Sequence, residues 1–159
     1  REMDSLAGDT DQVDVLLFGL GRYGSTLANM LRERGCHLLA IDFDPAAVRL
    51  HEREGYRARY GDAEDPEFIA ALPLEKVVWV VSTLRDRALN RALLQGLKQQ
   101  SFRGKVAISS STRREADDFR QNGVDLVLVP YADAAKEAAD KLVRECRRHY
   151  DNQSLGVGV

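Results

Sequence analysis

The sequence is poor in cysteine, and this absence limits the kinds of site that it can build. Only two of its 159 residues are cysteines, Cys36 and Cys146, and they lie far apart with no Cys-x-x-Cys or mixed Cys/His spacing. A disulfide framework is therefore not indicated, and neither is a zinc site. We expect no bound metal, and the low cysteine content is typical of a cytosolic protein.

The sequence also lacks an excess of charge of either sign. Its 23 Lys and Arg residues against 25 Asp and Glu residues leave a formal net charge of −2. A protein that binds nucleic acid or an anionic membrane surface normally carries a positive field, so this balance argues against both partners.

Long apolar runs are absent as well. The longest purely apolar run covers residues 77–81, far short of the ~18–20 residues needed to cross a bilayer, and the first residues show no signal-peptide pattern. A membrane role would therefore come through a partner or through a longer chain of which this one is a part. The first residue, Arg1, fits such a fragment but also a processed or tagged chain.

The sequence does contain enough apolar residues for one packed domain. Hydrophobic residues make up 44% of the chain, a proportion that argues against a mainly disordered protein. Residues 1–12 are polar without an apolar period, and residues 151–159 end in a short glycine-containing stretch, so we expect a flexible linker and a flexible tail there. The domain itself is predicted over residues 13–150.

Short apolar runs alternate with amphipathic stretches along this domain. The runs have the length of strands, and the stretches between them have helical period. Three of the helix starts carry N-capping patterns: Asp44-Pro45, Asp65-Pro66, and Thr112 with Glu115. The predicted strands cover residues 13–18, 37–42, 57–60, 77–82, 105–109 and 124–129, and the predicted helices cover residues 23–34, 45–54, 66–72, 85–100, 113–121 and 132–148.

Strand and helix thus alternate throughout the domain, and this alternation predicts an α/β fold. We expect a Rossmann-type doubly wound, six-stranded parallel sheet with right-handed crossovers and strand order 3-2-1-4-5-6.

A glycine motif after the first predicted strand carries the main functional signal. Residues 19–24 read Gly-Leu-Gly-Arg-Tyr-Gly, a G-x-G-x-x-G that follows an apolar strand and opens an amphipathic helix. In this setting Gly19 permits a tight turn, Gly21 lets the backbone approach a phosphate, and Gly24 allows close packing of helix and strand. The free N–H groups at the helix start then bind the anion. A glycine turn without a ligand is the alternative.

An acidic residue is expected about 20 positions after such a motif, where it accepts hydrogen bonds from ribose hydroxyls. Asp42 stands there. Asp44 is the alternative, although Pro45 after it marks Asp44 as the cap of the next helix. A carboxylate at this point repels a 2′-phosphate, and Phe43 adds no positive charge. NAD(H) or an adenosine nucleotide (AMP, ADP or ATP) is therefore favoured over NADP.

Two further strand ends are predicted to face the same crevice. Asp62 and Ala63 follow the third strand, where an adenine edge would lie, and a solvated loop aspartate is the alternative for Asp62. Ser82 and Thr83 end the fourth strand, so their hydroxyls are candidates for contact with the second half of a ligand. Ordinary strand-end polarity explains these two residues equally well.

No catalytic constellation accompanies this predicted nucleotide site. A dehydrogenase needs a general acid or base beside the nicotinamide and usually a second domain for its substrate. The sequence has no Tyr-x-x-x-Lys motif, and we expect its three histidines, His37, His51 and His149, at the surface. A binding domain without catalytic residues is predicted, and an NAD-dependent oxidoreductase domain or subunit is the alternative.

The last predicted helix carries a stripe of small and apolar residues at a four-residue repeat. Two explanations are open: burial within the chain's own fold, which we favour, and contact with a second copy. The stripe comprises Ala134, Ala135, Ala138, Ala139, Leu142 and Val143.

Taken together, these segments resemble the regulator of K⁺ conductance N-terminal domain, also called the KTN or Trk-type nucleotide-binding domain. Within that family the chain is most similar to the cytoplasmic C-terminal domains of Kef-type monovalent cation/proton antiporters. The matching segments are LLFGLGRYGSTLANMLRERG, LLAIDFDPAAV, YGDAEDPEFIAAL and VVWVVSTLRDRALN.

The resemblance implies a cytoplasmic regulatory domain that binds NAD(H) or an adenosine nucleotide and forms a homodimer. It also implies a membrane partner at the inner face of the cell membrane: a monovalent cation transporter, either a cation/proton antiporter or a K⁺ channel. Carried over to this sequence, Asp42 lies at the ribose with Phe43 beside it, and Thr83 lies on the far side of the cleft. Asp62 and Ala63 lie at the adenine, and the phosphate site comprises Gly19, Gly21, Arg22, Tyr23 and Gly24.

Overall fold

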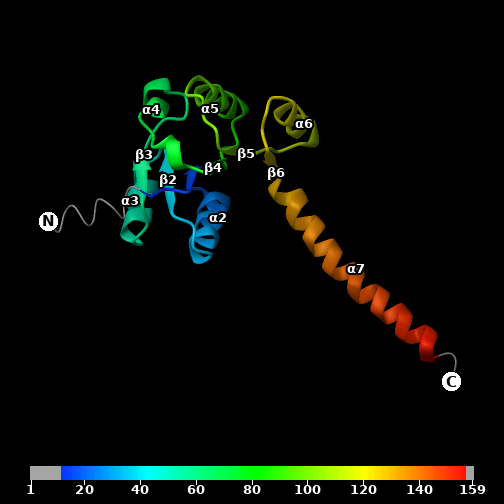
Figure 1. Cartoon of the computed structure of the whole chain (residues 1–159). Coiled ribbons are helices and arrows are strands. Elements are labelled where there is room, and N and C mark those ends of the chain that lie inside the picture. The colour runs from blue at the N-terminus through cyan, green and yellow to red at the C-terminus, as the bar shows by residue number, and fades with distance from the viewer. Residues whose placement is uncertain (1–11, 157–159) are drawn as a thin grey trace.

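The structure is a computed structural model that describes residues 12–156, and a six-stranded parallel sheet forms its centre (Figure 1). The predicted sheet order 3-2-1-4-5-6 is confirmed. The predicted linker over residues 1–12 falls almost wholly outside the described residues. Across the sheet the strands are β3 (Ala58–Tyr60), β2 (Leu38–Asp42), β1 (Val15–Phe18), β4 (Trp79–Ser82), β5 (Lys105–Ser109) and β6 (Leu126–Leu128).

Helices cover both faces of this sheet (Figure 1). One face carries α2 (Arg22–Glu33) and α3 (Pro45–Arg53). The other carries α4 (Pro66–Ala70), a 3-10 turn η1 (Leu74–Lys76), α5 (Arg87–Gln99) and α6 (Arg113–Gln121). Right-handed crossovers produce this division, because the chain moves along the sheet in one direction from β1 to β3 and in the other from β4 to β6. The larger apolar core lies on the side of α4, α5 and α6.

The N-terminal caps predicted from the sequence are present. The side chains of Asp44 and Asp65 accept hydrogen bonds from Ala46 N (2.9 Å) and Glu67 N (3.0 Å), and that of Thr112 accepts one from Glu115 N (3.2 Å). A fourth cap, Asp86 at the start of α5, was not predicted; its carboxylate accepts from Ala88 N at 2.8 Å. The expected helix over residues 85–100 therefore begins two residues later, at Arg87.

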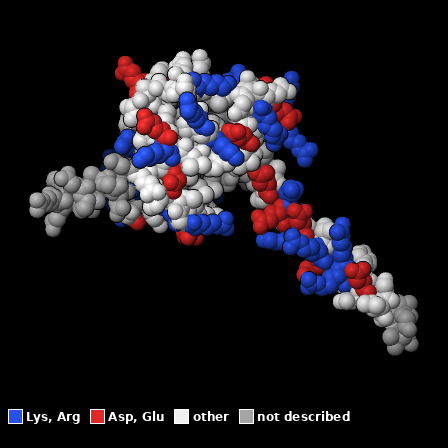
Figure 2. Space-filling model, in the orientation of Figure 1, with Lys and Arg blue, Asp and Glu red and all other residues white. Residues whose placement is uncertain are grey.

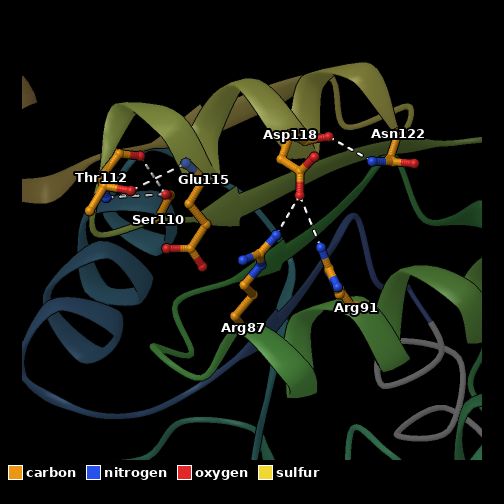
Figure 3. Close-up of polar contacts among 7 residues, drawn as sticks. All are labelled: Arg87, Arg91, Ser110, Thr112, Glu115, Asp118 and Asn122. Atoms are coloured by element: carbon orange, nitrogen blue, oxygen red, sulfur yellow. Dashed lines mark hydrogen bonds and ion pairs between the residues drawn. The ribbon is translucent and has the colours of Figure 1, made fainter.

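An ion cluster joins α5 to α6 across their exposed sides (Figure 3). Arg87 and Arg91 donate to the same oxygen of Asp118, at 2.6 and 2.9 Å. These hydrogen bonds, first from Arg91 and then from Arg87, lower the pKa of Asp118 below its usual value. Because all three side chains are largely exposed, the cluster orients the two helices more than it stabilises the fold.

The last helix, α7 (Pro130–Gly156), differs most from expectation. It starts directly after β6 and leads away from the sheet (Figure 1), and it continues to Gly156 through most of the predicted flexible tail. None of its residues is buried. The expectation that its apolar stripe is buried within the chain's own fold is therefore wrong, because most of the helix extends beyond the sheet and the helices that cover it (Figure 1).

The surface carries mixed charge, as the balanced composition predicts. In Figure 2, Lys and Arg side chains alternate with Asp and Glu over the visible face and along α7. Among the described residues, no helix is both long enough and apolar enough to span a bilayer. The same part of the chain contains no cluster of three His, Cys, Asp or Glu side chains that could hold a metal ion.

His51 is buried rather than at the surface, which corrects the expectation for this histidine. It is only 4% exposed, and its Nε2 accepts a hydrogen bond from Arg32 Nη1 at 2.7 Å. The ring of Tyr56 completes the cluster, 5.1 Å from the His51 ring and 4.2 Å from the Arg32 guanidinium carbon. Burial, followed by the Arg32 charge, lowers the pKa of His51 below its usual value, while Glu54 opposes this effect.

This burial predicts that acid destabilises the protein. As the pH falls below about 6.5 the unfolded chain binds a proton at His51, whereas the folded chain with its lowered pKa does not, so the free energy of unfolding falls. Because one proton is bound, the free energy of unfolding can fall by at most about 1.4 kcal/mol per pH unit. Urea unfolding between pH 7.5 and 5.5 should show a smaller decline in His51→Gln than in the wild type. In the control His149→Gln, at an exposed histidine, the full decline should persist; an unchanged decline in His51→Gln would contradict the prediction.

Candidate functional site

The loop between β1 and α2, residues 19–24, is shaped by two glycines that have no room for a side chain. Gly19 has a φ of +103°, in the region that favours glycine, and a Cβ there would lie 2.5 Å from Thr83 Oγ1. A Cβ on Gly24 would overlap the carbonyl oxygen of Gly19. Gly21 differs, because nothing lies within 4 Å of the place where its Cβ would be. The backbone at Gly21 is therefore open to a ligand.

Thr83, at the end of β4, holds this loop from the side. Its hydroxyl donates to the carbonyl oxygen of Gly19 at 2.9 Å. The carbonyl oxygen of Phe18, 3.1 Å from the same hydroxyl, is a second acceptor. The sequence predicts Thr83 on the far side of the ligand cleft; in the described structure its hydroxyl contacts the glycine loop. The neighbouring Ser82 hydroxyl is fully buried and hydrogen-bonded to Asn90, so it is not exposed to a ligand.

Among the described helices α2 to α6, α2 is the one whose N-terminus has no side-chain cap. A side chain caps each of α3, α4, α5 and α6, whereas α2 begins after Gly21 with no side-chain cap and no acidic residue in its first turn. The first N–H groups of a helix need partners and carry the positive end of the helix dipole. Gly21 and Arg22 are exposed. This arrangement presents unpaired N–H donors to an anion at the surface.

Asp42, at the end of β2, connects the glycine loop to the rest of the site. Its Oδ2 accepts a hydrogen bond from Leu20 N at 2.6 Å, and its Oδ1 accepts one from Asp44 N at 2.8 Å. Each carboxylate oxygen has further lone pairs, and the side chain is only half-buried. Asp42 can therefore hold the loop and still accept hydrogen bonds from a ligand. The Asp44 side chain caps α3, as the sequence predicts for it.

A pocket of about 200 Å³ lies beside Asp42, at the carboxyl ends of β1, β2 and β3. Four predicted site residues line it: Asp42, Phe43, Asp62 and Ala63. The pocket also has residues that sequence reasoning missed, most of them apolar: Phe18, Ile41, Gly61, Glu64, Leu84 and Leu89. Apolar walls with a few carboxylates suit a flat base and its sugar hydroxyls, and a phosphate would be repelled.

The loop after β3 makes two close local contacts at this pocket. Asp62 Oδ1 accepts a hydrogen bond from Glu64 N at 2.9 Å, and a Cβ on Gly61 would overlap the ring of Phe68. Asp62 therefore has a local structural role as well as a place in the pocket wall. Phe43 is 66% exposed at the mouth, where its ring lies 5.9 Å from that of Tyr60. Tyr60 was missed, although its place directly before Gly61 and Asp62 was a usable signal.

Tyr23 and Arg22 differ in their surroundings. Arg22 is exposed at the start of α2, beside the unpaired N–H groups. Tyr23 is half-buried, and burial together with the nearby Asp133 carboxylate raises the pKa of its hydroxyl. Asp133 lies in the first turn of α7, so charge at the start of that helix acts on Tyr23.

The fold and the site together define a Rossmann-type nucleotide-binding domain, with an anion site at a helix N-terminus and an acidic residue at the end of the second strand. The family model of the TrkA-N domain matches residues 15–130, so the chain belongs to the TrkA-N domain family. This assignment confirms the resemblance seen in the sequence.

Solved structures with the same fold include an Archaeoglobus fulgidus domain, the NAD(P)-binding domain of an exopolyphosphatase-related protein. It is 27% identical over 84% of this chain and 99% of its own, with a TM-score of 0.74. The TrkA-N domain of the inner membrane protein YbaL from Escherichia coli is 21% identical over 83% and 98%, with a TM-score of 0.71. The Kef C-terminal domain from Shewanella denitrificans, solved with AMP bound, is 19% identical over 83% and 80%, with a TM-score of 0.67. The YbaL and Kef domains are only 21% and 19% identical to this chain, so their similarity shows a shared fold.

Two glycines of the loop, Gly24 and Gly21, should lose different amounts of stability on the same substitution. Gly24→Ala places a methyl group on a backbone oxygen that cannot move away, so it should cost about 3 kcal/mol or more of unfolding free energy. Gly21→Ala enters open space and should cost less than about 1 kcal/mol. Urea denaturation of both variants checks the difference, and equal losses would show that the loop is not packed as described.

Proposed function

We propose that this protein is a regulatory nucleotide-binding domain. The observation that carries the proposal is the pairing of an uncapped α2 N-terminus with a half-apolar, acidic pocket, joined by the 2.6 Å hydrogen bond from Leu20 N to Asp42. One end of the site attracts an anion and the other accommodates a base and sugar hydroxyls. A nucleotide has both parts.

Each part of the ligand has its proposed residues. The phosphates lie on the backbone of residues 19–24, including Gly19, Gly21 and Gly24, with Arg22 as the nearby cation and Tyr23 beside them. The ribose hydroxyls donate to Asp42. The adenine lies between Phe43 on one side and Asp62 with Ala63 on the other.

The ligand is NAD(H) or an adenosine nucleotide such as AMP, ADP or ATP. Asp42, Asp62 and Glu64 line the pocket together, and no Lys or Arg is among the residues that line it. A 2′-phosphate on the ribose would enter this acidic region unpaired, so NADP(H) is disfavoured. The AMP in the Shewanella Kef domain and the NAD(P)-binding description of the Archaeoglobus domain support this range of ligands.

Regulation of a membrane transport protein is the function that fits such a domain in this family. The domain, residues 13–150, would act on the cytoplasmic side of the membrane and control a monovalent cation transporter, a cation/proton antiporter or a K⁺ channel. The membrane protein YbaL and the Kef domain support this placement. An NAD-dependent oxidoreductase is the second candidate, and turnover of NADH with a substrate would favour it.

We propose that two copies pair through α7. The helix extends over 27 residues with none of them buried, and its stripe includes Leu142 and Val143, which are 67% and 44% exposed. A helix with an apolar side gains most of its stability from packing against another element. Leu126 on β6 is 47% exposed and lies on the sheet face of α2 and α3, since it pairs with Ala107 of that core. A second copy would cover both surfaces.

The ribose assignment predicts a loss of affinity in Asp42→Ala. Removal of charge-assisted hydrogen bonds should weaken nucleotide binding by about 1.5–3 kcal/mol. Calorimetric titration with NAD⁺, NADH, NADPH, AMP, ADP and ATP, after removal of nucleotide carried over from expression, measures this loss and identifies the preferred ligand.

Asp44→Ala is the matched control for Asp42→Ala. It removes the cap of α3, so it should lower stability by about 1 kcal/mol and leave the affinity unchanged. Equal affinity of the Asp42→Ala variant and the wild type would refute the ribose assignment. If the wild type bound none of the six nucleotides, the proposed function itself would fail.

The dimer proposal predicts that a charge on the stripe separates the copies. Leu142→Glu places a carboxylate in the proposed contact, so sedimentation should show a monomer where the wild type shows a dimer. Arg144→Glu, on the opposite side of α7 by helical period, should remain dimeric. A monomeric wild type would contradict the proposal.

A further inference from the structure

Two fully buried polar side chains, Ser82 and Asn90, lie next to the proposed nucleotide pocket. Both are 0% exposed, and the Ser82 hydroxyl donates to Asn90 Oδ1 at 2.5 Å. Ser82 ends β4, and Asn90 lies on the face of α5 that packs against the sheet. Buried polar groups destabilise a core unless their hydrogen bonds are made.

The hydrogen bonds of this pair go to the loop between β4 and α5. Leu84 N donates to Ser82 Oγ at 3.2 Å, and Asn90 Nδ2 donates to Leu84 O at 2.8 Å. Both the backbone N–H and the backbone carbonyl group of Leu84 are thus hydrogen-bonded to this buried pair. Asn90 Nδ2 also reaches the carbonyl oxygen of Ser109 at the end of β5, at 3.5 Å, which connects the loop to the next strand.

The start of α5 does not need this pair. Asp86 caps the helix, with its carboxylate accepting from Ala88 N and Leu89 N. Leu84 itself is half-buried at the surface, where water could satisfy its backbone groups. What the pair adds is a defined position for Leu84.

That position is a wall of the proposed site. Leu84 lines the pocket together with Leu89, Phe43 and Asp42. Its side chain also reaches the glycine loop, since a Cβ on Gly19 would lie 3.4 Å from Leu84 Cδ2. Leu84 therefore lies where the anion site meets the pocket for the base.

We infer that Ser82 and Asn90 are positioning residues that hold Leu84 as an apolar wall for the base and ribose of the bound nucleotide. The inference rests on the proposed function. The ligand class is one with a base, because an apolar wall gains contact with a base and sugar face and gains nothing with phosphate alone. The pair acts through Leu84 and touches no ligand atom.

A double-mutant cycle with AMP and NAD⁺ as probes tests this inference. Leu84→Ser removes the wall and leaves the buried pair intact; we expect the affinity to fall about fivefold or more. Ser82→Ala releases Leu84 N and should lower the affinity about threefold or more. In the double variant the loss should be little more than in Leu84→Ser alone, because both changes remove the same contact.

Ser110→Ala is the control, since Ser110 is similarly buried, 4% exposed, at the end of the neighbouring strand. Its hydroxyl bonds to Thr112 and not to the loop after β4 (Figure 3). The Ser110→Ala variant should keep its affinity within about twofold even if its melting temperature falls as far as that of Ser82→Ala, because lost stability alone does not change the pocket.

The outcomes separate the inference from the proposed function. Wild-type affinity in Leu84→Ser, a variant that keeps both members of the buried pair, would overturn the inference while nucleotide binding stands. Losses that simply add in the double variant would overturn the role of Ser82 in positioning Leu84. A wild type that binds neither AMP nor NAD⁺ would overturn both proposals.

Discussion

The described site depends on one close approach, between the glycine loop and the end of β4. Gly19, Gly24 and Thr83 meet so closely that a Cβ on either glycine would collide with Thr83 Oγ1 or with backbone. The Thr83 hydroxyl then satisfies the Gly19 carbonyl oxygen. Because repulsion between atoms at this distance is steep, the loop has one arrangement, and that arrangement aims the start of α2 outward.

The N-termini of helices α2 to α6 are of two kinds, those capped by a side chain and one left open. In α3, α4, α5 and α6 a side chain satisfies N–H groups at the start, whereas α2 leaves its own unpaired. Asp42 compensates in part, because it accepts the Leu20 N–H just before the helix. The carboxylate lies to one side of the anion site, so the loop is held while the helix start stays open.

Helix α7 differs from the other described α-helices in that none of its residues is buried. The sheet and helices α2 to α6 bury two apolar cores, and α7 buries nothing. The charge of Asp133 in its first turn nevertheless raises the pKa of Tyr23 in the glycine motif, after the larger effect of burial. An element without buried residues can change its position at little cost to the core.

The sequence by itself determined the order of strands and helices along the chain and the order of strands in the sheet. It also determined where the glycine loop lies and that Asp42 stands at the end of the second strand. These follow from local periodicity, from the handedness of crossovers and from a motif that lies within one strand–turn–helix unit. Only the tertiary structure decided that Thr83 contacts Gly19, 64 positions away, that Leu84 and Leu89 line the pocket, that His51 is buried, and that α7 leaves the fold. The reason is that burial and hydrogen-bond partners depend on which surfaces the fold brings together, and an apolar stripe or a lone hydroxyl looks the same in sequence whichever surface it meets.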